Sequence, residues 1–172
     1  MAVTMSDISK LRKLTGAGMM DCKKALEETN CDMDAAVEII RKKGQAVAAK
    51  REDREASEGC VLSAATADFC AIVALKCETD FVANGADFIK LTQDILDAAI
   101  AAKAQTLDEV KALKLGEADV QAAVTQRSGI TGEKMELDGY NVLEGENIEV
   151  YDHMKKHTPV SYTHLRAHET EA

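Results

Sequence analysis

The sequence predicts an α+β protein in which a helical segment is followed by a small antiparallel sheet packed with helices. Apolar residues recur at helical spacing through residues 5–54. The period changes to that of strands near residue 60 and becomes helical again after residue 79. Helices that cover one face of a small antiparallel sheet form an α+β domain.

The composition indicates a globular chain with an aliphatic core. The 172 residues suffice for one medium domain or two small ones. They are 46% hydrophobic and 30% charged, which is an ordinary globular balance. Aromatic residues make up only 3% and tryptophan is absent, so alanine, valine, leucine, isoleucine and methionine must fill the core.

The net charge of -9 is unevenly distributed. Residues 1–54 contain eleven basic and nine acidic side chains, whereas residues 55–172 contain ten basic and twenty-one acidic ones. Nucleic-acid binding needs a basic face that neutralises phosphates. We therefore expect no direct contact with nucleic acid or with anionic membranes, and a protein partner instead.

The cysteine pattern and the N-terminus predict a cytoplasmic protein. The five cysteines are odd in number and show no C-x-x-C spacing, which is typical of reduced thiols. No apolar signal segment follows Met1. No stretch approaches the roughly 18 apolar residues that a membrane-spanning helix requires.

The first segment, residues 1–54, is predicted to form a three-helix bundle. Ser6 is the expected N-cap of its first helix. Ile8, Leu11 and Leu14 form an apolar stripe on that helix and are expected to lie in the core.

Two turns and a charged connector delimit the other helices of this segment. Residues 15–18 contain two glycines and break the first helix, and residues 30–32 form the turn before the third. Gly44 is expected to weaken or end the third helix. The charged run 51–55 marks a domain boundary.

The second segment, residues 55–156, is predicted to contain the sheet. Its first two strands form a hairpin with a short turn, and the second is apolar on both faces, which indicates a central strand. Thr106 and Glu109 match a capping box at the start of a short helix. The expected strands are residues 60–66, 69–75, 135–143 and 147–151, and the expected helices are residues 88–102, one from 106, and 120–129.

The last segment, residues 157–172, differs from the rest of the chain. It contains three of the four histidines and the only proline, and it has no helical or strand periodicity. Its histidines lack a matching carboxylate or cysteine set, so we expect no metal site. Residues 160–170 resemble the translation of a sequencing adaptor. We interpret the segment as non-native and disordered, and expect it to pack against nothing; a genuine disordered tail is the alternative.

Two motifs resemble the signatures of the elongation factor Ts family. The first, residues 11–26, reads LRKLTGAGMMDCKKAL, and the second, residues 77–84, reads CETDFVAN. Their length, their order and their separation of about 50 residues make the resemblance specific, and it extends to about residue 156. One position departs from the family pattern, because Lys76 stands where the family often has asparagine before the cysteine.

The resemblance implies a fold and a function. Residues 1–54 would form a three-helix domain like ubiquitin-associated domains, and residues 55–156 an incomplete core subdomain of the dimerisation type. Members of this family promote guanine-nucleotide exchange on the GTPase elongation factor Tu. The implied protein is not an enzyme, needs no cofactor or metal, and has elongation factor Tu as its partner.

The second motif supplies the strongest candidates for partner contact. By resemblance, Thr79, Asp80, Phe81 and Val82 contact elongation factor Tu, with Phe81 as an apolar wedge and Asp80 near the metal. Spacing alone favours other roles, because Thr79 suits an N-cap and most aromatic side chains are buried. The family resemblance therefore predicts that Phe81 is substantially exposed in the free chain.

The first motif supplies a second contact surface. The family docks its N-terminal domain on the partner's G domain, and by resemblance Leu11, Met19 and Met20 have this role. A core position is the other interpretation of Leu11. Met19 and Met20 are adjacent and cannot share one helical face, so at least one should be exposed. His153 is a weaker candidate for partner contact.

Two other functional classes are considered. Ubiquitin-associated domains bind ubiquitin or peptides, so the chain could be an adaptor without exchange activity, although an adaptor has no need of the second motif. A thiol enzyme would need a histidine beside Cys22 or Cys77, and His153 is the only histidine before the last segment. Both cysteines are expected to be small buried apolar residues.

Overall fold

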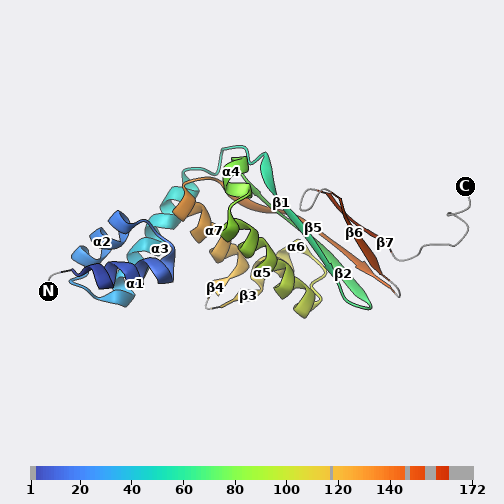
Figure 1. Ribbon diagram of the computed structural model, residues 1–172, viewed down its shortest axis with the longest axis horizontal. Coiled ribbons are helices and arrows are strands. Elements are labelled where there is room, and N and C mark those ends of the chain that lie inside the picture. Colours follow the sequence, from blue (N-terminus) through green and yellow to red (C-terminus); the bar gives the residue numbers. More distant parts are fainter. Residues whose placement is uncertain (1–2, 117, 146–147, 154–157, 163–172) are drawn as a thin grey trace, which may run out of the picture. The chain divides into compact units, whose positions relative to one another are not determined.

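The computed structural model describes residues 3–116, 118–145, 148–153 and 158–162 (Figure 1). The chain divides into two compact units. Unit 1 comprises residues 1–54 and 125–134, and unit 2 comprises residues 55–124 and 135–172. The first break follows Arg54, within the charged connector. No sequence pattern predicted that residues 125–134 belong to unit 1.

Unit 1 contains a three-helix bundle, formed by α1 (Met5–Thr15), α2 (Met19–Glu28) and α3 (Met33–Ala49). The N-cap of α1 is Thr4 and not Ser6. Thr4 accepts a hydrogen bond from the backbone of Asp7, and the Asp7 carboxylate accepts one from the backbone of Thr4, which makes a capping box. The capping box with Asp7 thereby places the start of the helix two residues earlier than an N-cap at Ser6 would.

The core of unit 1 is aliphatic, as the composition predicted. It contains buried residues from all three helices and from the loop after α1: Ile8, Leu11, Ala17, Cys22, Ala25, Leu26, Ala36 and Ile40. The expected core position of Leu14 is wrong, because this side chain is 69% exposed. Leu14 follows Leu11 by three residues, but the buried stripe of α1 continues through Thr15 instead.

The third helix continues through Gly44 to Ala49, so the expected end at Gly44 is also wrong. At Gly44 the helix passes close to Gly129 of α7 (Val120–Thr131). A Cβ atom on Gly129 would lie 2.6 Å from the carbonyl oxygen of Gly44. Both residues belong to unit 1. The missing side chain of Gly129 permits the close helix crossing, and Gly44 does not interrupt α3.

Unit 2 contains a three-stranded antiparallel sheet of β1 (Glu58–Ala65), β2 (Phe69–Cys77) and β5 (Met135–Glu144). The strand order is β1-β2-β5, so the apolar strand β2 is central. Every second residue of β2 from Phe69 to Cys77 is buried. These residues face the helices of the unit, and the predicted α+β class is confirmed.

A bulge interrupts the pairing of β2 with β5. Ala74 pairs with Gly139 and Leu75 pairs with Leu137, which leaves Asp138 as the extra residue. The carboxylate of Asp138 lies 2.5 Å from the Nζ atom of Lys76. The departure from the family pattern at Lys76 is thus accompanied by an ion pair with the bulged residue.

Helices cover one face of this sheet (Figure 1). α5 (Ala86–Ala102) packs against β1 and β2 through Phe88, Ile95 and Ala99. The start of α7 contributes Val120 and Val124 to the same core. The remaining short elements of the unit are α4 (Asp80–Ala83), α6 (Leu107–Ala112), β3 (Lys114–Leu115) and β4 (Ala118–Asp119).

A second strand pair contacts β1. It consists of β6 (Glu149–His153) and β7 (Thr158–Tyr162), which run antiparallel. The expectation that residues 157–172 pack against nothing therefore fails for β7. Residues 157 and 163–172 lie outside the described residues, and the non-native origin of the segment stays a prediction.

Candidate functional site

The second motif lies where the central strand of the sheet ends and the helices begin. β2 ends at Cys77, and Thr79 is the N-cap of α4, which is a single helical turn. The Oγ1 atom of Thr79 accepts a hydrogen bond from the Val82 backbone at 3.4 Å. The capping role that spacing suggested for Thr79 is therefore present.

The four residues of α4 differ sharply in exposure. Ala83 is buried, and Val82 is half-buried against the core of unit 2. Phe81 is 86% exposed, the highest value among the exposed large apolar residues of the described chain. The inward side of this single turn is occupied by Ala83 and Val82, so Phe81 faces solvent. The prediction of an exposed Phe81 is confirmed.

Asp80 occupies the first turn of α4 and is exposed. A carboxylate in this place interacts favourably with the N-terminal end of a helix. It stands beside an exposed aromatic ring, so one turn presents a negative charge and an apolar surface side by side. Such a turn suits contact with a protein surface that is apolar in one place and polar in the next.

Side chains near α4 hold its backbone. The Asp80 carbonyl accepts hydrogen bonds from the backbone nitrogen of Asn84, at 2.9 Å, and from its side-chain Nδ2 atom, at 2.8 Å. The buried thiol of Cys77 donates to the Thr79 carbonyl, with a sulfur–oxygen distance of 3.2 Å. The sequence motif contained both residues, but its spacing gave no sign of these contacts.

The first motif presents a second exposed apolar surface, in unit 1. Met19 is 46% exposed and Met20 is 65% exposed, at the start of α2. The prediction that at least one would be exposed is confirmed. Leu14 lies near the end of α1, one short loop away, and is a further exposed residue that the apolar stripe of α1 did not predict.

Leu11 does not belong to this surface. Its side chain is fully buried in the core of unit 1, because it lies on the stripe of α1 that faces α2 and α3. A partner could reach it only by opening the bundle. The alternative interpretation, a core position for Leu11, is confirmed, and its predicted contact role stays a prediction that nothing here tests.

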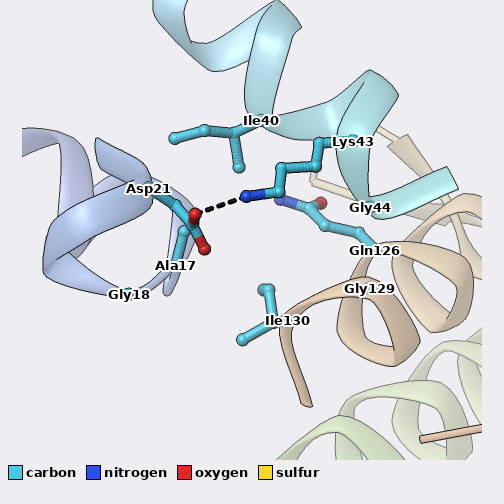
Figure 2. Close-up of a pocket in the computed structure, with 9 residues that line it drawn as sticks. All are labelled: Ala17, Gly18, Asp21, Ile40, Lys43, Gly44, Gln126, Gly129 and Ile130. Atoms are coloured by element: carbon cyan, nitrogen blue, oxygen red, sulfur yellow. Dashed lines mark hydrogen bonds and ion pairs between the residues drawn. The ribbon is translucent and has the colours of Figure 1, made fainter. Parts of the chain in front are cut away.

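A small hollow lies beside the loop of the first motif (Figure 2). An ion pair between Asp21 of α2 and Lys43 of α3 crosses it, as the figure shows. Its walls combine glycine backbone, apolar side chains and the polar side chains of Asp21, Lys43 and Gln126. The lining residues are Ala17, Gly18, Asp21, Ile40, Lys43, Gly44, Gln126, Gly129 and Ile130.

The thiols of both motifs are buried. Burial raises the pKa of Cys22, which disfavours the reactive thiolate. The structure describes no histidine side chain, including that of His153. Neither the predicted contact role of His153 nor a cysteine–histidine pair is tested. No metal-binding group of three or more side chains occurs among the described residues.

Comparison with known proteins shows the family. A family model described as elongation factor TS matches residues 78–170, which is more than half of the chain. The chain belongs to the elongation factor Ts family. The matched region begins at the second residue of the CETDFVAN motif and continues into residues 157–172, so the non-native origin of that segment remains untested.

Relatives named elongation factor Ts align with most of this chain. The relative from Bacteroides thetaiotaomicron is 69% identical over 156 residues, and the alignment covers 91% of this chain and 47% of the relative. The relative from Phocaeicola vulgatus is 70% identical over 153 residues, covering 89% and 46%. That from Porphyromonas gingivalis is 60% identical over 154 residues, covering 89% and 56%. The chain thus spans about half the length of these elongation factor Ts relatives.

None of the helices in the described part of the chain is both long and apolar enough to cross a membrane.

Proposed function

We propose that the chain promotes the release of GDP from elongation factor Tu and that Phe81 makes the decisive contact. The exposed ring of Phe81 on α4 carries this proposal. Burial of a phenylalanine side chain in a partner pocket would contribute about 1.5–3 kcal/mol. Single aromatic anchors of this kind often provide a large share of the energy of an interface.

Exchange of this type breaks no covalent bond. The chain would bind the nucleotide-free GTPase more tightly than the GDP-bound form, and linkage then weakens GDP binding by the same factor. Phe81 would enter an apolar pocket of the GTPase, and Asp80 would disturb polar contacts near the Mg²⁺ and phosphate site. The protein is in this view a binding factor and not an enzyme.

Met19 and Met20 would provide a second contact with the same partner. Both are exposed at the start of α2, and flexible thioether side chains adapt well to a partner surface. Leu14 joins them as a further exposed apolar side chain near the same loop. Thr79 has a local role, since it caps α4, while Val82 packs partly on the core.

The test is the release of a fluorescent GDP analogue from a bacterial elongation factor Tu. The full chain should accelerate release, and Phe81→Ala should reduce the acceleration by about tenfold or more, because the variant loses its anchor. Met5→Ala is the matched control, since Met5 is also an exposed apolar residue but lies on α1 outside both motifs' contact residues. Full activity of Phe81→Ala would contradict the proposal.

A chain that fails to accelerate release gives two further results. If it still binds the GTPase through Phe81, then exchange needs a part of the relatives that this chain does not cover. If it does not bind, the exchange function is wrong for this chain.

A further inference from the structure

The exposed ring of Phe81 sits on an unusually small support. α4 has four residues, and one helical turn has little stability of its own. A rigid probe nevertheless requires a fixed backbone at this turn, because ordering it during association would reduce the affinity. Whatever holds α4 in the free chain therefore prepares Phe81 for binding.

One contact that holds α4 comes from Asn84. Its side-chain Nδ2 atom donates to the Asp80 carbonyl at 2.8 Å, parallel to the backbone hydrogen bond from the same residue. This second donor links the residue after the helix to its first residue. Asn84 itself is exposed, so its side chain has no packing role to explain its place.

A second contact comes from Cys77, at the other end. Its side chain is fully buried at the end of β2, and its thiol donates to the carbonyl oxygen of Thr79, the N-cap residue. The last residue of the central strand is thereby connected to the first residue of the turn. The carbonyls of Thr79 and Asp80, which belong to two consecutive peptide groups, thus both accept hydrogen bonds from side chains.

We propose that Asn84 and Cys77 are positioning residues that fix α4 and so orient Phe81 for its partner. The proposal rests on the proposed function for its consequence in exchange, but the fixing of α4 is a property of the free chain. The two side chains donate hydrogen bonds to the backbone carbonyls of the two residues that precede Phe81.

The chain offers a direct probe of this proposal, because it contains no tryptophan. Phe81→Trp places the only tryptophan of the chain on α4, and time-resolved anisotropy of its fluorescence, excited selectively over tyrosine, reports how freely the ring moves. In this background Asn84→Asp keeps the size of the side chain but removes its donor. Asn141→Asp is the matched control, since it makes the same change at an exposed position of β5.

Asn84→Asp should lower the residual anisotropy of the tryptophan, whereas Asn141→Asp should leave it unchanged. Cys77→Ala should act like Asn84→Asp, and Cys77→Ser should restore the parent value because a hydroxyl also donates. Circular dichroism would confirm that each variant is folded. If Cys77→Ala does not fold, the comparison of Asn84→Asp with its control still decides for Asn84. Equal residual anisotropy in Asn84→Asp and Asn141→Asp would overturn the proposal.

The exchange assay separates this inference from the function on which it rests. With Phe81 restored, Asn84→Asp should raise the concentration of the chain that gives half-maximal acceleration of GDP release by about threefold to tenfold. This is the loss of affinity expected for one hydrogen bond. Asn141→Asp should match the parent. A lower anisotropy in a chain that never accelerates GDP release would support the fixing of α4 and overturn the exchange function alone. Unchanged exchange by Asn84→Asp in an active chain would overturn the role of Asn84.

Discussion

Single residues decide which apolar side chains this molecule exposes to solvent. Phe81 is solvent-exposed although most aromatic side chains are buried, whereas Leu11 is buried although it lies in the first motif. Only the family motif predicted the exposure of Phe81, because the spacing of apolar residues favoured burial of this ring. The exposure of Leu14 could not be predicted, because it depends on which flank of α1 meets the other helices.

Thiol exposure gives a prediction at the residue scale. Cys31 is half-buried, while Cys22, Cys60, Cys70 and Cys77 are buried. We expect a thiol-specific reagent to modify about one of the five cysteines quickly in the native chain, because reaction needs an accessible thiolate. The raised pKa of Cys22 means that less of its thiolate exists at any pH below that pKa, which slows it further.

Absorbance of the released thiol chromophore measures this reaction. Cys31→Ser should remove the fast phase, and urea should make all remaining thiols reactive. A fast phase that persists in Cys31→Ser would show that one of the buried thiols is accessible after all.

Element boundaries followed the sequence where local chemistry sets them. Thr79 and Thr106 were predicted as caps, and the side chain of each accepts a hydrogen bond from the backbone nitrogen three residues later. The close approach of α3 to α7 at Gly44 was not predictable in this way, because Gly129 lies more than eighty residues away in the chain. The bulge at Asp138 was not predictable from local sequence either, because the register of a strand depends on the strand with which it pairs.

The crossing of α3 and α7 gives a prediction at the element scale. Gly129→Ala should lower the free energy of unfolding by about 1–3 kcal/mol, because the new methyl group would overlap the backbone of Gly44. Gly44→Ala should be neutral or stabilising by up to about 1 kcal/mol. Its Cβ atom would lie 3.6 Å from the Cα atom of Gly129, an ordinary contact, and alanine favours helix.

Urea denaturation followed by circular dichroism compares the two variants. They carry the same substitution on the two sides of one crossing, so each controls for the other. Equal stabilities would show that the helices do not approach each other as closely as described.

At the scale of the whole molecule, the chain consists of two units, and each unit is made of two segments that are separated in the sequence. Unit 1 takes its last ten residues, 125–134, from the end of α7 and the residues that follow. Composition and periodicity located the change near Arg54, because the charged connector is a local feature. They could not assign residues 125–134, since Gly129 and Ile130 show their role only in contact with unit 1 residues.

Limited proteolysis tests this organisation. Trypsin should cut first in the exposed connector, after Arg51 or Arg54. We expect the two fragments to remain associated, because residues 125–134 belong to the larger fragment but pack with the helices of the smaller one.

Size-exclusion chromatography of the nicked chain measures the association. The fragments should elute together in buffer and separate in urea, and Gly129→Ala should loosen the complex. Fragments that separate in buffer would contradict the assignment of residues 125–134 to unit 1.

The most direct test of the central claim is the affinity of the chain for elongation factor Tu in two states of the GTPase. Titration should show that the nucleotide-free form binds the chain about tenfold more tightly, or better, than the form saturated with GDP. Phe81→Ala should lose most of the affinity for the nucleotide-free form. Equal affinity of the chain for both forms would contradict the account, because such a ligand cannot shift the binding of GDP.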